Sequence, residues 1–103
     1  MKGVIHSRLE KCIIKRNIAI KNAKEYLFEN MLDISQEFNI RFPKAILQME
    51  NEDLIEWIIE NSQKFLSQRY KGLEHVEFVY LVEDLIVSDN NVRIAETIES
   101  LCV

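Results

Sequence analysis

The stretch that decides the fold is SRLEKCIIKRNIAIKNAKEYLFENMLDISQEFN, residues 7–39, because one apolar stripe runs along it. At 100° per residue the stripe stays within an arc of about 80°. Its members are Ile5, Leu9, Ile13, Ile20, Ala23, Leu27, Met31, Ile34 and Phe38. Ser7 and Glu10 have the spacing of a capping box, which predicts that a helix starts there. We therefore expect one long helix near residues 7–39. A break around 17–22 is the alternative, because the sequence at 18–20 briefly alternates.

Arg16 falls inside this apolar arc. Its long aliphatic stem could lie along apolar surface while the guanidinium reaches water, or the residue could mark a kink. The other interpretation is a charge placed deliberately in the interior.

Beyond the first helix, the sequence predicts shorter elements. Pro43 stops the first helix, and residues 44–49 suit one or two helical turns. Asn51 has the character of an N-cap for a helix near 52–71. Gly72 stands where a left-handed C-cap is expected.

The stretch 73–87 is ambiguous, because it is rich in Val, Leu and aromatic residues that also suit a strand. Its acids Glu74, Glu77 and Asp84 gather on one side of a helical wheel rather than alternating, which favours a buried helix. Residues 88–91 read as a polar linker, followed by a last helix near 91–102.

Only two glycines and one proline are present, so tight turns are scarce and long helices are favoured. The expected fold class is all-α, a compact four- to five-helix bundle or orthogonal helical array with a long N-terminal helix. Residues 1–103 form a single helical domain in this interpretation.

Charge is divided unevenly along the chain. Residues 1–48 carry a net charge of +4 and residues 49–103 a net charge of −8, which gives −4 in total. No run is apolar and long enough for a membrane helix, and no secretory signal is seen. Cys12 and Cys102 stand alone, which is typical of buried thiols in a reducing compartment, and a disulfide between them is the alternative. We expect a cytoplasmic protein.

Catalytic chemistry has little support in the sequence. His6 and His75 are the only side chains that ordinarily titrate near neutral pH, and no nucleophile, phosphate-loop or zinc motif is present. His75 with Glu74 and Glu77 comes nearest to a metal cluster, but residues two apart on a helix point in different directions. We therefore expect no enzyme, no catalytic residue, no metal and no cofactor.

Recognition is better supported, by one tryptophan among acids on a predicted helix face and by further acids beside a tyrosine that could supply apolar contact. The candidate partner-binding residues are Asp53, Glu56, Trp57, Glu60, Glu74, Glu77, Tyr80 and Asp84. A tryptophan ringed by acids on a polar helix face is a typical interface anchor, and an acidic patch steers a basic partner. The alternatives are that Trp57 packs under a neighbouring helix or the 40–50 loop, and that the acids are ordinary solvated surface.

The first helix also has a basic outer face, formed by Arg8, Lys11, Lys15 and Lys21. It could meet nucleic-acid phosphates, but no basic–aromatic interleaving accompanies it and the net charge is −4, which argues against nucleic acid as a partner. It could equally complement the acidic half, within one chain or in a homodimer.

In size, acidity and helicity the chain resembles bacterial immunity proteins, although no residue motif carries this resemblance. The resemblance implies an acidic inhibitor, or antitoxin, that neutralises a basic toxin such as a nuclease by direct binding. The alternative is a regulatory or adaptor protein that self-associates through the long N-terminal helix, whose stripe could serve as a dimer seam as readily as a core.

Overall fold

The computed structural model describes residues 2–69 and 71–101, with side chains from Arg8 onward. The fold is all-α, as predicted, and these residues contain no strand. The elements in chain order are α1 (Lys2–Phe38), the 3-10 helix η1 (Ile46–Gln48), α2 (Asn51–Glu60), α3 (Ser62–Leu66) and α4 (Val76–Leu101).

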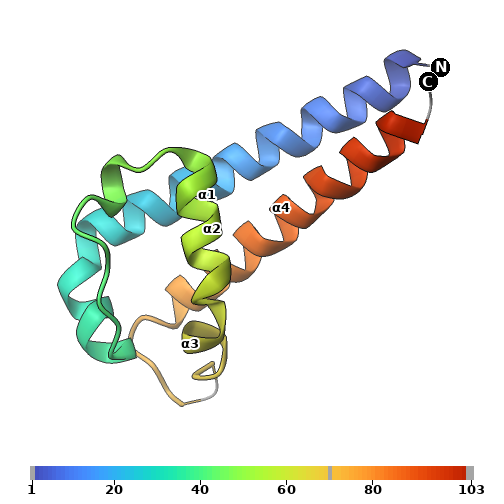
Figure 1. The fold of residues 1–103 in the computed structure, drawn as a ribbon. Coiled ribbons are helices and arrows are strands. Elements are labelled where there is room, and N and C mark those ends of the chain that lie inside the picture. Colours follow the sequence, from blue (N-terminus) through green and yellow to red (C-terminus); the bar gives the residue numbers. More distant parts are fainter. Residues whose placement is uncertain (1, 70, 102–103) are drawn as a thin grey trace.

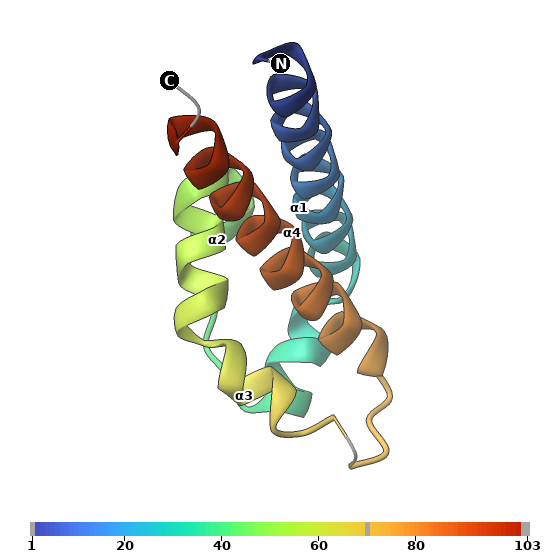
Figure 2. The same cartoon turned by 90° about the vertical axis from the view of Figure 1, so that its right-hand side faces the viewer.

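Two long antiparallel helices form the frame. α4 runs back along α1, so the start of α1 and the end of α4 lie at the same end of the molecule (Figure 1). η1, α2 and α3 gather around the other end, and α2 begins beside α1 and crosses towards α4, so that it contacts both long helices (Figure 1 and Figure 2). The result is elongated, with extents of 49 × 29 × 19 Å.

The long first helix confirms the prediction from the apolar stripe. Ile20, Ala23, Leu27, Ile34 and Phe38 are all buried. The capping-box prediction was wrong, because α1 already begins at Lys2 and residue 7 lies inside it.

α1 has its irregularity at Asn30, not at residues 17–22. Asn30 has φ −130° and ψ 16°, and its side-chain Nδ2 donates to the Tyr26 carbonyl at 3.1 Å. That carbonyl is the ordinary acceptor for the Asn30 backbone N–H, so side chain and backbone compete for it. The helix is therefore kinked one turn after Tyr26.

Asn39 ends α1, four residues before Pro43. Its φ of 51° is left-handed, the Ile40 N–H donates to the Ser35 carbonyl at 3.1 Å, and the Asn39 N–H donates to the Gln36 carbonyl at 3.4 Å. These two bonds form a Schellman motif, which satisfies carbonyls at the helix end. The stop predicted at Pro43 is thus made earlier, by an asparagine that tolerates positive φ.

The predicted helix over 52–71 is divided into α2 and α3. At Asn61, φ is −104° and the side-chain Nδ2 donates to the Trp57 carbonyl at 2.8 Å, as at Asn30. The N-cap of α2 is Glu50, without a side-chain bond, while Asn51 accepts from Lys24 Nζ at 3.4 Å. The N-cap prediction for Asn51 was therefore wrong. Gly72 does have a left-handed φ of 65°, but it lies beyond the end of α3 at Leu66.

α4 confirms the helix predicted for most of residues 73–87. It contradicts the linker predicted at residues 88–91. Residues 88–91 are helical, so the predicted linker does not exist and the two predicted C-terminal helices are one. Asp89 in this segment is buried on the same face as Leu85 and Val92. Burial of this face outweighs the weak local preference of Ser, Asp and Asn for turns.

Three phenylalanines join the helices at the wide end of the molecule. Phe38 of α1 and Phe78 of α4 each pack edge-on against Phe65 of α3, with ring centroids 5.2 Å apart in both pairs. All three side chains are buried. The short helix α3 is therefore held by this aromatic contact rather than by its own length, since five residues are too few for an independently stable helix.

We predict that Phe65→Ala lowers the free energy of unfolding by about 3–5 kcal/mol, because it leaves a cavity between three helices. Tyr80→Ala is the matched control, since Tyr80 is a large aromatic residue that is 53% exposed, and its cost should stay near 0.5 kcal/mol or below. Urea denaturation followed by circular dichroism measures both. Equal costs for the two variants would contradict a core centred on Phe65.

Candidate functional site

A buried carboxylate lies at the contact between α1 and α4. Asp89 Oδ1 accepts from Arg16 Nη1 at 3.3 Å, and Asp89 Oδ2 accepts from Arg93 Nε at 2.9 Å. Asp89 is 4% exposed, and Arg16 is partly buried. Arg16 is thus an interior charge, the second of its two sequence interpretations, and its partner comes from the segment predicted to be a linker.

Each oxygen of Asp89 faces a guanidinium, which offsets the cost of burying this carboxylate. An unpaired buried carboxylate would be strongly unfavourable. The hydrogen bond from Arg93 to Asp89, together with the negative charge of Asp89, raises the pKa of Arg93. The Nε of Arg16 is buried and has no hydrogen-bond partner among the residues described.

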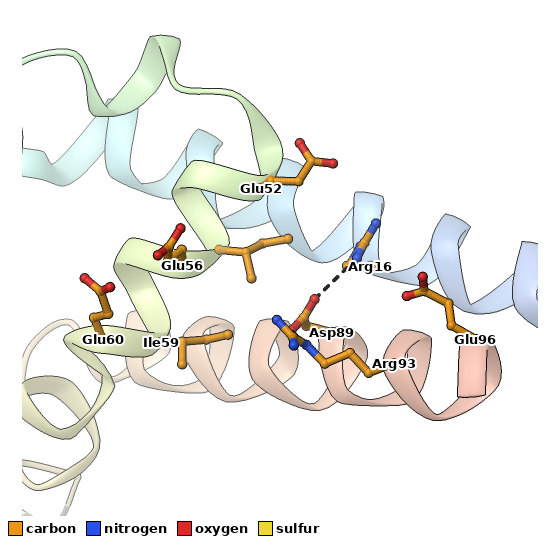
Figure 3. A pocket seen from close by; sticks show the side chains of 9 residues that line it. Arg16, Glu52, Glu56, Ile59, Glu60, Asp89, Arg93 and Glu96 are labelled. Atoms are coloured by element: carbon orange, nitrogen blue, oxygen red, sulfur yellow. Dashed lines mark hydrogen bonds and ion pairs between the residues drawn. The ribbon is translucent and has the colours of Figure 1, made fainter. Parts of the chain in front are cut away.

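This ion network forms the floor of a cleft of about 430 Å³ between α2 and α4 (Figure 3). α2 contributes glutamates at three positions spaced by four residues, which places them along one edge of the helix. The lining residues are Arg16, Glu52, Ile55, Glu56, Ile59, Glu60, Asp89, Arg93 and Glu96.

The cleft is negative. Five carboxylates and two guanidiniums line it, a formal excess of three negative charges. Asp89 engages both guanidiniums, and in the described part of the chain no ion pair reaches Glu52, Glu56, Glu60 or Glu96. Figure 3 shows these four carboxylates around the Arg16–Asp89–Arg93 network. The rim therefore keeps uncompensated charge beside the apolar walls of Ile55 and Ile59.

A second polar cluster surrounds His75. Its Nδ1 lies 2.8 Å from the Tyr26 hydroxyl, in a hydrogen bond whose donor depends on the imidazole tautomer. The backbone N–H of His75 donates to both oxygens of Glu37, at 3.1 and 3.2 Å. His75 Nε2 lies 3.8 Å from Asp33 Oδ2. Burial, followed by the charges of Glu77, Glu37 and Glu74, raises the pKa of Tyr26.

Glu37, Glu74 and His75 are the side chains that could hold a cation, since ligand atoms from all three lie within 4.8 Å of one another. In the sequence His75 stands nearest to Glu74 and Glu77, and the structure brings in Glu37 from α1 in place of Glu77. Glu37 already accepts the His75 N–H, so its carboxylate has a structural role without a metal.

The expected binding residues on α2 divide between the cleft and the core. Glu56 and Glu60 line the cleft, whereas Asp53 is exposed outside the lining. Trp57 is half-buried against the core, with its ring 5.3 Å from that of Phe42. Packing beneath the 40–50 segment, the alternative stated for Trp57, is therefore present.

The other expected residues lie away from the cleft. Glu74 and Glu77 belong to the surroundings of Tyr26 and His75. Tyr80 and Asp84 are exposed on α4 and do not line the cleft. The predicted acidic face is thus two separate acidic regions.

Sequence reasoning missed Asp89, Arg93 and Glu96 as members of a site. A signal for Asp89 existed, because it stands four residues after Leu85 and three before Val92, on the buried arc of α4. It was overlooked because neighbouring asparagines indicated a linker.

Some sequence predictions lie outside what the structure describes. They concern the side chain of His6 and the thiol of Cys102, and with it a disulfide to Cys12. Cys12 itself is a half-buried free thiol.

Comparisons of the chain with models of protein families, with curated protein sequences and with solved structures found no match. Within the described residues, no helix combines the length and apolar character needed to cross a bilayer.

We predict that Asp89→Asn lowers the free energy of unfolding by about 2–3 kcal/mol, because the partly buried Arg16 loses its counter-charge. Arg93→Gln should cost much less, since Arg93 is largely exposed and water screens its ion pair with Asp89. Urea denaturation measures the difference. A cost for Asp89→Asn no greater than that for Arg93→Gln would show that the Arg16 pair contributes nothing.

A second prediction concerns alkaline pH. Because the folded pKa of Tyr26 is raised above its ordinary value of 10.0, the unfolded chain loses this proton first. Stability is therefore full below about pH 10 and falls as the pH rises from there through the folded pKa. Tyr26→Phe should lack the loss of stability at alkaline pH that Tyr26 causes, whereas Tyr80→Phe should show the same loss as the parent. Thermal unfolding between pH 9 and 12 measures it, and an unchanged profile in Tyr26→Phe would contradict the assignment.

Proposed function

We propose that this chain is a non-catalytic protein-binding module that inhibits a basic protein, and that the cleft between α2 and α4 is the binding site. The observation that carries the proposal is the row Glu52, Glu56 and Glu60, unpaired among the described residues and lining the cleft together with Glu96. The proposed class is an acidic immunity or antitoxin-like protein, acting in the bacterial cytoplasm on a toxin such as a nuclease.

The cleft favours an arginine or lysine side chain of the partner. The glutamates supply acceptors for its charged end, and Ile55 and Ile59 supply an apolar wall for its aliphatic stem. Asp89 offsets one of the two guanidinium charges of Arg16 and Arg93, and the four glutamates of the lining outnumber the one that is left, so the cleft as a whole attracts a cationic side chain.

Inhibition follows from charge mimicry. A nuclease holds phosphates on a basic surface, and a preformed row of carboxylates on a helix can occupy that surface. The row is rigid because α2 buries Leu54, Ile55 and Ile58 in the core. A rigid acidic face loses little conformational entropy on binding, which favours tight association.

The core stripe of α1 no longer supports the alternative of self-association through it. Its central residues Ile20, Ala23, Leu27 and Ile34 are buried within the chain itself. They are occupied by the protein's own core and cannot also form a seam between two copies.

We predict that the immobilised chain captures a basic protein from an extract of its native host in a one-to-one complex. The complex should weaken with salt, because the Debye length falls from about 10 Å at 0.1 M to about 3 Å at 1 M ionic strength. Glu56→Lys combined with Glu60→Lys should reduce the affinity at least tenfold, about 1.4 kcal/mol or more, mainly by slowing association. Surface plasmon resonance with the captured protein measures both rates.

The matched control is Glu74→Lys combined with Glu77→Lys, the same charge change in the other acidic region. This control should retain the affinity within about twofold, a change well below 1 kcal/mol. Full binding by the Glu56/Glu60 variant, with its circular dichroism unchanged, would refute the cleft as the binding site.

A further inference from the structure

The outer side of α1 carries a second apolar stripe that the core does not use. Ile14, Ile18, Phe28 and Leu32 are 58%, 53%, 76% and 70% exposed. With Lys21 and Glu25 between them, they follow one another at spacings of four, three, four, three and four residues. This is the heptad spacing of a coiled-coil seam, and on a straight helix these six positions fall within an arc of about 80°.

This outer stripe is separate from the core stripe. At 100° per residue its centre lies roughly 140° around α1 from the centre of the core residues. Single exposed apolar residues are ordinary on a protein surface, but a row at seam spacing along one helix is characteristic of an interface.

The outer stripe is symmetric about its centre: two apolar residues lie at each end, and one lysine and one glutamate, of opposite charge, lie in the middle. Ile14 and Leu32, Ile18 and Phe28, and Lys21 and Glu25 stand nine, five and two residues on either side of Ala23. A two-fold axis at the level of Ala23 therefore sets each member opposite its counterpart in another copy. A two-fold interface requires such self-complementarity.

We infer that a second copy of this chain packs antiparallel on the outer stripe. In that arrangement Ile18 faces Phe28 of the second copy, and Lys21 faces Glu25 of the second copy. The two-fold axis repeats each of these contacts, so the interface contains two Lys21–Glu25 pairs. A parallel pair would instead set Lys21 against Lys21 and Glu25 against Glu25, which is repulsive within a seam.

The residues beside the seam agree with this orientation. Lys15 and Glu29, both exposed, flank the seam on one side and would meet across it, because antiparallel helices bring opposite ends of the stripe together. Within one chain the Lys21–Glu25 pair is weak. It spans 4.0 Å, both side chains are largely exposed, and lysine precedes glutamate, the less favourable order on a helix.

α1 also has a surface hollow at the level where the antiparallel arrangement places Ile18 of the second copy. The hollow has a volume of about 270 Å³ beside Phe28 and is lined by Lys24, Glu25, Glu29 and Leu47 as well. Ile18 of the second copy lies at this level in the antiparallel arrangement, as a knob opposite a hole. The kink at Asn30 precedes Leu32, so the seam is centred on residues 14–28 and is short. A short seam gives a dimer that depends on concentration.

Analytical ultracentrifugation of the full chain tests this inference. The mass should rise with concentration from 12.2 kDa towards twice that value. Ile18→Glu combined with Phe28→Glu should raise the dimer dissociation constant at least tenfold, a change of about 1.4 kcal/mol. Val87→Glu combined with Ile94→Glu is the matched control, because these residues are also exposed apolar residues but lie on α4, and it should dimerise as the parent does.

The orientation is tested by charge exchange. Lys21→Glu alone and Glu25→Lys alone should each weaken the dimer, because each variant brings like charges together. The double variant should restore it, since opposite charges face each other again. Circular dichroism checks that every variant keeps its helices, which is expected because all these side chains are exposed.

Three results would overturn the inference: a monomer at every concentration up to the millimolar range, a dimer unaffected by Ile18→Glu with Phe28→Glu, or no restoration in the charge-exchanged double variant. These variants leave Glu52, Glu56, Glu60 and Glu96 in place. Partner capture by the monomeric variant therefore tests the cleft separately, and either proposal can fail without the other.

Discussion

The pairing of Asp89 with Arg16 and Arg93 is the constraint on which the arrangement of this molecule depends. A buried carboxylate between two helices must meet positive charge, so it ties one level of α4 to one level of α1. It is compatible only with helical residues 88–91, which place Asp89 on the buried face of α4 with Leu85 and Val92. Finally, it engages the guanidiniums at the floor of the cleft and so leaves the glutamates of α2 uncompensated.

Two asparagines interrupt helices elsewhere in the fold, and both do so by the same interaction. Asn30 and Asn61 each donate a side-chain amide hydrogen to the carbonyl four residues earlier, and each interrupts a helix. Each irregularity is followed by a phenylalanine of the aromatic cluster, Phe38 about two turns after Asn30 and Phe65 about one turn after Asn61. Breaks in helix regularity thus accompany the convergence of α1 and α3 on Phe78 of α4.

The two proposed surfaces differ in the physics that would drive binding. The cleft offers charge with a small apolar wall, which favours fast, salt-sensitive association with a basic partner. The outer stripe of α1 offers apolar area with one charge pair on each side of its centre, which favours a symmetric contact whose orientation is set by charge. Both surfaces depend on the same frame, because α1 presents the stripe outward while α4 holds its inner side.

The sequence by itself determined the all-α class, the long first helix and its buried face, since apolar periodicity reports directly which side of a helix leaves water. It also marked Arg16 as anomalous and Glu56 and Glu60 as exposed acids. Tertiary structure alone decided that Asp89 is buried, that Asn51 does not cap α2, and that Trp57 packs on Phe42. Local preferences differ by a few tenths of a kcal/mol per residue, whereas burying one large side chain contributes about 1.5–3 kcal/mol. Contacts between distant segments therefore decide wherever the two conflict, as they do at residues 88–91.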